Sequence, residues 1–289
     1  MKPPPFRYSA PTSVAEALEL LVTDVDADAR VLAGGQSLVP LMNFRLAQPS
    51  HLVDLRRVEE LARIRTEDGM LVIGAMVRMT DAEHSPEVAV AAPLLAEALG
   101  QVAHPPIRNS GTVGGSIAHA DPAAELPAVA LALDAELVVT GADGTRTVAA
   151  GDFFHGPFTT AVAPGEILTE VRLPHRGGGH AFVEFARTHG SFALVGAAAV
   201  IELDGDTVAR ASIALSGVAP TPVRAAAAEE VLTGSTPDAA TIRAAAEAGA
   251  AALSPTGDVQ ASPETRVDIA RSYLRRGIEL ALSRAQDRR

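Results

Sequence analysis

The sequence predicts an α+β fold, and three observations along its 289 residues support this class. Short apolar runs of strand length alternate with segments whose apolar residues recur at helical spacing. Gly177-Gly178-Gly179 interrupts the pattern and is the best candidate for a linker, near residue 176. Hydrophobic residues make up 47% and charged residues 20% of the chain, so we expect a sizeable core and little disorder.

The first 55 residues are expected to begin with a strand, a helix and a strand and to form a compact unit with short connections. Thr12 or Ser13 can cap a helix, because Glu16 follows Ser13 at the spacing of a capping box. The elements expected after that helix are a strand over residues 30–33, a short helix over 38–44 and a strand over 51–55.

Two Asp-Gly turn signals indicate hairpins in the middle of the chain. Asp68-Gly69 and Asp143-Gly144 each lie between runs of strand length, so we expect one hairpin at each position. The other elements expected here are helices from residue 80, over 93–103 and over 122–133, a glycine-rich loop over 107–121, and a strand over 167–173.

The part after the glycine linker is expected to form an antiparallel sheet of three strands with helices. His175 and His180 flank the linker, and we expect both to be solvated. The expected strands cover residues 181–186, 194–203 and 209–216, and the expected helices cover 224–232, 237–252 and 264–284.

Composition excludes several classes of function. The chain has 24 Lys+Arg and 35 Asp+Glu, a net charge of −11, which argues against nucleic acid and anionic membranes as main partners. It has no cysteine, so it cannot itself hold a disulfide, a Cys-ligated zinc or an iron–sulfur cluster. Lys2 is the only lysine, which excludes a G-x-x-x-x-G-K phosphate loop. No targeting segment or membrane span is evident, so we expect a cytoplasmic protein.

Two glycine-rich segments are the best candidates for a binding site. The first, Ala33-Gly34-Gly35-Gln36-Ser37-Leu38, follows a buried strand and leads into a helix. Glycines allow backbone N–H groups to approach an anion closely, and the helix N-terminus adds partial positive charge, so a pyrophosphate fits there. A plain strand-to-helix turn that needs a positive φ explains the same residues.

The second segment is Asn109-Ser110-Gly111-Thr112-Val113-Gly114-Gly115-Ser116, whose successive amides can form an anion nest. A structural Ω-loop is the alternative. Apart from Arg108 at its edge, neither segment supplies a basic side chain. A ligand held mainly by amides of two loops suits an extended diphosphate such as FAD better than ATP with magnesium, because clustered carboxylates for the metal are missing.

Other catalytic and metal-binding patterns are weak. None of the eight histidines belongs to an H-E-x-x-H motif, so we expect no metal site. No G-x-S-x-G motif is present, which argues against a Ser-His-Asp hydrolase, and we assign no catalytic residue. His119 is the one histidine close to a glycine-rich segment, although a loop histidine bonded to a carbonyl explains it equally well.

Three segments together resemble the FAD-binding medium subunit of the molybdenum hydroxylases, a family that includes aerobic carbon monoxide dehydrogenase and bacterial xanthine dehydrogenase-like enzymes. They are AGGQSLVPLMNFRL at 33–46, PPIRN leading into GTVGGS at 105–116, and ADPAAELP at 120–127. The resemblance implies a two-subdomain FAD-binding module of the PCMH type, over residues 1–57 and 58–176. A C-terminal α+β domain of the carbon monoxide dehydrogenase flavoprotein type would follow over 177–289.

The resemblance also implies where FAD lies. Backbone amides of the two glycine-rich segments would hold the diphosphate and ribityl chain, and Leu168 would lie near the isoalloxazine. Ser191 stands where the family commonly has Asp, which is a departure in a segment near the flavin. The implied cofactor-binding residues are Ala33, Gly34, Gly35, Gln36, Ser37, Leu38, Ile107, Gly111, Thr112, Val113, Gly114, Gly115, Ser116, His119, Asp121, Glu125 and Leu168.

By the same resemblance the chain is an electron-transfer subunit of an oxidoreductase. Its partners would be a small [2Fe-2S] subunit and a large molybdenum-cofactor subunit, with electrons passing from the clusters through FAD to an external acceptor. Two alternatives are a free-standing FAD-dependent oxidoreductase of the same fold and a binding module without enzymatic activity. A Gly115→Val change is expected to drive a side chain into the diphosphate and abolish FAD retention without unfolding the chain.

Overall fold

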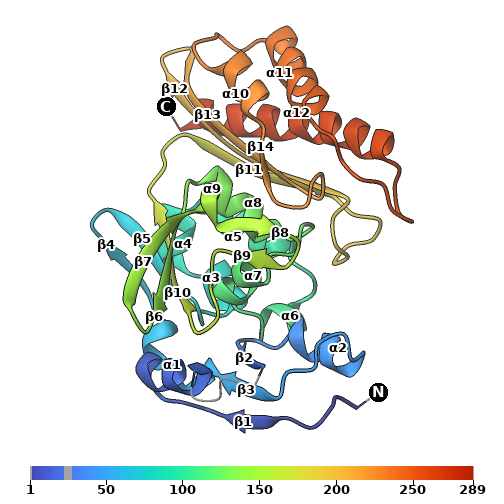
Figure 1. Ribbon diagram of the computed structural model, residues 1–289. Coiled ribbons are helices and arrows are strands. Elements are labelled where there is room, and N and C mark those ends of the chain that lie inside the picture. The colour runs from blue at the N-terminus through green and yellow to red at the C-terminus, as the bar shows by residue number, and fades with distance from the viewer. Residues whose placement is uncertain (1, 23–27, 289) are drawn as a thin grey trace.

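The computed structural model describes residues 2–22 and 28–288, which form three consecutive parts stacked along one direction (Figure 1). A small parallel sheet comes first, a larger antiparallel sheet with helices lies in the middle, and a second antiparallel sheet with helices ends the chain. Within the described residues, no helix is long and apolar enough to cross a membrane. The mixed sheets and helices confirm the predicted α+β class.

The N-terminal part is a parallel sheet in the order β1-β3-β2. Ser13 caps α1 as predicted, since its Oγ accepts a hydrogen bond from the Glu16 N–H at 3.2 Å. β1 is the strand expected ahead of this helix, and it pairs in parallel with β3. The elements are β1 (Arg7–Ser9), α1 (Val14–Val22), β2 (Ala29–Leu32), α2 (Leu38–Asn43), β3 (His51–Asp54) and the 3-10 turns η1 (Leu55–Arg57) and η2 (Glu59–Leu61).

The middle part is built on a five-stranded sheet in the order β4-β5-β10-β6-β7. Both predicted hairpins are present, and Asp68 and Gly69 turn the first with positive φ angles of 50° and 75°. The strands are β4 (Ile64–Glu67), β5 (Met70–Gly74), β6 (Glu136–Gly141), β7 (Gly144–Ala149), β8 (Phe154–Gly156), β9 (Thr159–Thr160) and β10 (Ile167–Pro174). The helices are α3 (Met79–Glu83), α4 (Pro86–Ala91), α5 (Pro93–Gln101), α6 (Pro105–Arg108), α7 (Val113–His119), α8 (Glu125–Ala132) and α9 (Ala150–Phe153).

The expectation of a loop over residues 107–121 is wrong, because most of this segment is helical in α6 and α7. Glycine has a low helix propensity, so Gly114 and Gly115 in the sequence argue against a helix at α7. Tertiary packing overrides that preference: a Cβ atom on Gly114 would lie 2.5 Å from the Cα of Ala75. Only glycine lets this helix approach β5 so closely.

The C-terminal part is a four-stranded antiparallel sheet in the order β11-β12-β13-β14, with helices on one face. The prediction of three strands is therefore short by one, because the two residues of β14 are too few for a periodic pattern. The elements are β11 (Gly179–Phe185), β12 (Val195–Asp204), β13 (Thr207–Ser216), β14 (Val223–Arg224), α10 (Ala226–Leu232), α11 (Ala239–Ala251) and α12 (Pro263–Asp287).

The expected solvation of His180 is wrong. This residue belongs to β11 and is 2% exposed, with Nε2 at 3.1 Å from the Arg176 carbonyl oxygen. Burial lowers its pKa and keeps the imidazole neutral. His175 is exposed as expected. The glycine-rich linker is therefore shorter than its sequence indicates, because β11 already begins at Gly179.

The C-terminal sheet has two apolar faces, which is why α8 can pack between the two larger sheets. Along β12, Ala198 and Val200 belong to the core shared with α5 and α8. Their neighbours Ala197, Ala199 and Ile201 belong to the core shared with α10, α11 and α12. This alternation is the period of two of a β-strand that is buried on both faces.

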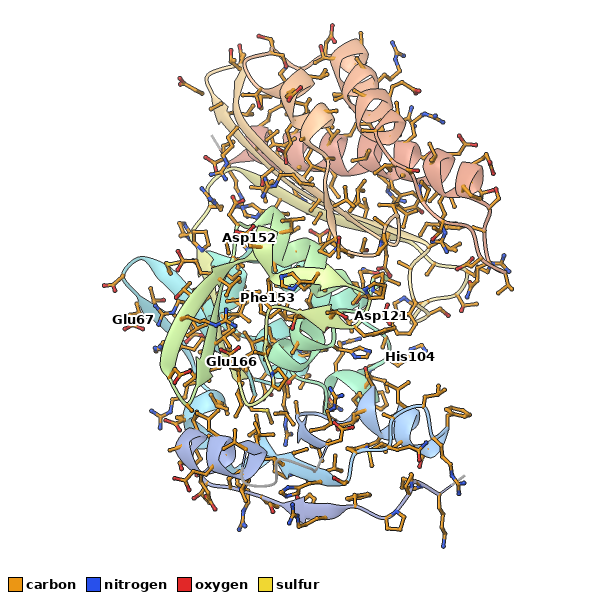
Figure 2. All side chains as sticks on the ribbon, viewed as in Figure 1. Glu67, His104, Asp121, Asp152, Phe153 and Glu166 are labelled. Atoms are coloured by element: carbon orange, nitrogen blue, oxygen red, sulfur yellow. The ribbon has the colours of Figure 1, made fainter. Side chains whose placement is uncertain are left out.

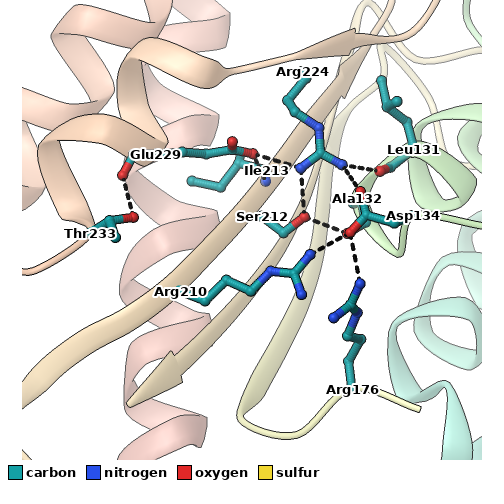
Figure 3. A network of polar contacts seen from close by, with 10 residues as sticks. All are labelled: Leu131, Ala132, Asp134, Arg176, Arg210, Ser212, Ile213, Arg224, Glu229 and Thr233. Atoms are coloured by element: carbon teal, nitrogen blue, oxygen red, sulfur yellow. Dashed lines mark hydrogen bonds and ion pairs between the residues drawn. The ribbon is translucent and has the colours of Figure 1, made fainter. Parts of the chain in front are cut away.

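Asp134 joins the middle and C-terminal parts (Figure 3). Directly after α8, it receives ion pairs from Arg176 in the linker, Arg210 on β13 and Arg224 on β14. Arg224 also donates to the Leu131 carbonyl oxygen at 2.6 Å. Three cations on one carboxylate fix the C-terminal end of α8 against the C-terminal sheet.

Candidate functional site

The two glycine-rich segments, at residues 33–38 and 109–116, are in direct contact although they lie far apart in the sequence. A Cβ atom on Gly34 would lie 2.7 Å from the Cα of Gly111 and closer still to the carbonyl oxygen of Ser110. Likewise, a Cβ atom on Gly115 would lie 3.3 Å from the Cβ of Ala33. The absence of side chains at these glycines is what allows the two backbones to meet.

The first segment presents a run of open backbone donors. Among the described residues, the N–H groups of residues 34–38 find no hydrogen-bond acceptor. Gly35 has a φ of +73°, a backbone angle that glycine adopts without strain, and the chain turns at this residue. The Gln36 side chain folds back onto the Gly34 carbonyl oxygen at 3.1 Å, which holds the turn. The Ser37 hydroxyl makes no capping bond to α2.

The second segment is less open than its sequence indicates. The Val113 and Gly114 N–H groups donate to the carbonyl oxygens of Val77 and Ala75 at 2.9 and 3.0 Å. The Gly115 N–H donates to Oγ1 of Thr112, the N-cap of α7, at 3.0 Å, and the Ser116 N–H donates to the Thr112 carbonyl oxygen. The four amides from 113 to 116, expected to be donors to a diphosphate, are therefore already occupied within the chain.

This geometry also changes what a Gly115 substitution would test. A Cβ atom at this position would lie 2.7 Å from Thr112 Oγ1. A valine would therefore displace the N-cap of α7 rather than simply enter a ligand cavity. The expectation that Gly115→Val acts on FAD without disturbing the fold is wrong for this reason.

Arg108 does not face the two loops as a free cation. Its guanidinium forms an ion pair with Glu83, with Nε to Oε2 at 2.8 Å, and donates to the Val102 carbonyl oxygen at 2.9 Å. Ile107 beside it is 37% exposed, and its carbonyl oxygen accepts the N–H groups of Ser110 and Gly111. Arg108 therefore fixes α6, and the donors for an anion remain backbone amides.

His119 and Asp121 follow the second segment at the C-terminal end of α7. The His119 ring packs against Phe158, with ring centroids 5.0 Å apart, and burial lowers the pKa of His119 despite the opposing effect of Asp121. An Asp121 carboxylate oxygen accepts the Ala123 N–H at 2.9 Å and shapes the turn into α8. Figure 2 shows Asp121 and His104 on the same side of the molecule, opposite the hairpin that carries Glu67.

Glu125 and Leu168 are both buried in the middle part. Glu125 begins α8 and is 5% exposed, and burial, with repulsion from Glu184 and Asp121, raises its pKa to about 7. Leu168 is 5% exposed and packs into the core from β10, beside a break in the strand register. Leu168 and Val113 of the second glycine-rich segment belong to the same apolar core, in which β10 packs against α7.

The segment around Ser191 closes onto the middle part from the C-terminal sheet. A Cβ atom on Gly190 would collide with the His104 ring, and the rings of His104 and His189 are 6.0 Å apart. The Ser191 hydroxyl bonds to Thr188 within its own loop at 2.6 Å. Sequence patterns did not single out His104 or Phe158, because both act through contacts that only the tertiary fold creates.

The donors present fit a dinucleotide diphosphate. Five consecutive free amides, the Ser37 hydroxyl and a second backbone segment in contact form a cradle, and a Cβ atom at Gly34 would force the two segments apart. In the described residues, no group of three or more His, Asp or Glu side chains is placed to hold a metal ion. The arrangement can bind and orient an anionic cofactor through its backbone.

Comparisons with known proteins find relatives over nearly the whole chain. The family model described as "FAD binding domain in molybdopterin dehydrogenase" matches residues 4–176, and the "CO dehydrogenase flavoprotein C-terminal domain" model matches residues 180–281. The α subunit of the 6-hydroxypseudooxynicotine dehydrogenase complex of Paenarthrobacter nicotinovorans is 43% identical, over 99% of this chain and 97% of that protein. The carbon monoxide dehydrogenase medium chain of Hydrogenophaga pseudoflava is 40% identical, over 98% of this chain and 99% of the relative.

Solved structures agree over the same length. A carbon monoxide dehydrogenase chain from Hydrogenophaga pseudoflava superposes with a TM-score of 0.96 at 41% identity, covering 99% of this chain and 100% of that one. A chain of quinoline 2-oxidoreductase from Pseudomonas putida 86 gives a TM-score of 0.94 at 40% identity, with 99% of each chain covered. Two family models and full-length relatives thus describe one kind of protein. The chain belongs to the FAD-binding medium subunits of the molybdenum hydroxylases, of the carbon monoxide dehydrogenase type, and is an oxidoreductase subunit that binds FAD.

Proposed function

We propose that this chain carries electrons within a larger enzyme, from iron–sulfur clusters on a partner subunit through FAD to an external acceptor. The relatives are named as medium chains or as subunits of dehydrogenase complexes. The chain contains no cysteine, so any iron–sulfur cluster must come from another chain. We further propose a small [2Fe-2S] subunit and a large molybdenum-cofactor subunit as its partners, in the cytoplasm.

The observation that carries this proposal is the contact between the two glycine-rich segments. We propose that the free amides of 34–38, with Ala33 and the Ser37 hydroxyl, hold the diphosphate of FAD. The residues from Gly111 to Ser116 would form the opposite wall through the Thr112 N–H and the Ser116 hydroxyl. When bound, FAD can take up electrons singly and release them in pairs, which is chemistry of the cofactor.

The remaining proposed FAD contacts shape the site around that cradle. Ile107, His119, Asp121, Glu125 and Leu168 would lie along the ligand. The neutral His119 imidazole can accept or donate one hydrogen bond, while the short bond between Asp121 and the Ala123 N–H orients that carboxylate.

Reconstitution tests the proposed assembly. The chain is expressed alone and together with a candidate cysteine-rich small subunit and a candidate large molybdenum-cofactor subunit, and each preparation is analysed by gel filtration, flavin content and iron content. We expect one FAD per chain and a three-subunit complex whose flavin is reduced when the organic substrate is added. A stable FAD-loaded monomer or homodimer, reduced by a substrate without either partner, would support the free-standing oxidoreductase instead.

A further inference from the structure

A row of three residues crosses the C-terminal sheet on the face that meets α8. Strand register places Glu184 of β11 opposite Gly196 of β12, and Gly196 opposite Ser216 of β13. A Cβ atom on Gly196 would lie 2.6 Å from the Ser216 Oγ and 3.8 Å from the Glu184 Cβ. The Glu184 and Ser216 side chains therefore flank the glycine on one face of the sheet.

The N-terminal end of α8 meets this row. The Gly217 N–H donates to the Pro122 carbonyl oxygen at 2.8 Å, and the Ser212 hydroxyl donates to the Ala132 carbonyl oxygen at 2.6 Å. These two bonds anchor α8 antiparallel to β13, so the start of the helix lies level with Ser216. Glu125 is the first residue of α8 and therefore lies next to the row formed by Glu184, Gly196 and Ser216.

The polar groups at this seam are buried without partners. Ser216 is 1% exposed and its Oγ has no hydrogen-bond partner, and the Glu184 Oε2 is also buried without one. Among the described residues, neither Glu125 nor Glu184 forms an ion pair with an arginine or lysine. Burying two ionised carboxylates without a cation in this seam would cost folding free energy, whereas burying a protonated carboxyl costs much less.

We propose that Glu125 and Glu184 act as one proton-holding carboxyl pair that ties the C-terminal sheet to the FAD-binding part. The Ser216 hydroxyl, which is buried without a hydrogen-bond partner, lies on the same face of the sheet as Glu184. Burial is the main cause that raises the pKa of each carboxyl to about 7. Because the two groups interact, their titration belongs to the pair.

The sign of the pH effect follows from these groups. Among the described residues, Asp121 also acts on Glu125, and it adds repulsion. Between the pKa of the unfolded chain and the higher pKa of the folded chain, the carboxyl is protonated when the chain is folded and ionised when it is unfolded. Stability then falls as the pH rises from about 4.5 to about 7, and it is level above that.

Thermal unfolding of the full chain between pH 5 and pH 9 tests the pair. Glu184→Gln and Glu125→Gln each replace a carboxyl with a neutral group of the same shape. We expect each variant to have the melting temperature of the wild type at pH 5 and a higher melting temperature than the wild type at pH 8. Its melting temperature should therefore depend less on pH. For each coupled proton, the unfolding equilibrium of the wild type shifts by up to about tenfold per pH unit in that window.

Glu97→Gln is the matched control. Glu97 crosses the same seam from α5 but is paired with Arg284 of α12 at 2.6 Å. Its loss should lower the melting temperature by a similar amount at pH 6 and pH 8. A Glu184→Gln variant that melts below the wild type at pH 8, or keeps the wild-type pH profile, would overturn the proposal.

Infrared spectroscopy supplies a readout that does not depend on stability. The folded wild type should show a protonated-carboxyl band at pH 6 that weakens by pH 8 and is reduced in either Gln variant. An unchanged band in both variants would contradict the pair. All measurements are made with and without FAD. The pair can therefore be confirmed or rejected even if the proposed FAD contacts are wrong.

Discussion

Single residues decide whether the two glycine-rich segments can meet. The glycine-rich composition of residues 33–38 and 109–116 made both segments candidates for a binding site, and the structure shows them in contact. Sequence could not show which amides stay free. Those of Val113 and Gly114 are taken by the carbonyl oxygens of Val77 and Ala75, which follow β5 and lie more than 30 residues earlier in the chain. Which of these backbone N–H groups are free and which are hydrogen-bonded therefore depends on tertiary packing alone.

Gly34→Ala tests the contact at this scale. The new Cβ would lie 2.7 Å from the Gly111 Cα, so the two backbones must separate, and a backbone clash of this kind costs about 1–3 kcal/mol. We expect FAD affinity, measured by quenching of flavin fluorescence, to fall at least about tenfold. Gly156→Ala is the control, because no atom lies within 4 Å of its Cβ position. Equal FAD affinity in both variants would remove the contact from the site.

Elements were predictable where their signals are local. The two Asp-Gly hairpins and the long α12 follow from turn residues and periodicity that neighbouring residues carry. The helix α7 was not predictable, because its glycines argue against a helix and its stability comes from β5. The same limit applies to β14, which exists only because β13 offers it an edge.

Two glycine-to-alanine changes separate helix propensity from packing. Gly151 is exposed in α9 with no atom within 4 Å of its Cβ position, so alanine there should stabilise the chain by up to about 1 kcal/mol. Gly114→Ala gains the same propensity, but its Cβ would lie 2.5 Å from the Ala75 Cα, and we expect a net loss of about 1–3 kcal/mol. Urea unfolding measures both. Equal stabilisation in the two variants would mean that α7 does not depend on its approach to β5.

At the scale of the whole molecule, the sequence predicts a break near residue 176. No local pattern predicts the ion pairs of Asp134, which connect the FAD-binding part to the C-terminal sheet. Asp134 sits after α8 with φ +50°, an unremarkable residue in a turn. Its three arginine partners come from residues 176 to 224, and nothing in their spacing relates them to one carboxylate. Such a joint becomes visible only once the two parts are placed together.

Asp134→Ala tests whether this joint holds the parts together. Removing the carboxylate leaves Arg176, Arg210 and Arg224 facing one another across a partly exposed seam, so repulsion replaces attraction. Solvent screening limits the effect, and we expect a loss of about 1–3 kcal/mol in urea unfolding at low salt. The loss should shrink in high salt, because screened like charges repel less.

A surface ion pair provides the comparison for Asp134. Glu247 pairs with Arg271 at 2.6 Å, but its side chain is 61% exposed, so Glu247→Ala should cost less than about 1 kcal/mol at any salt concentration. Protease digestion distinguishes a weakened joint from general instability, since only Asp134→Ala should expose the linker at 175–178. If both variants lose the same stability and are cut alike, the arginines around Asp134 are an ordinary surface cluster. The shared apolar core around α8 would then hold the two parts together by itself.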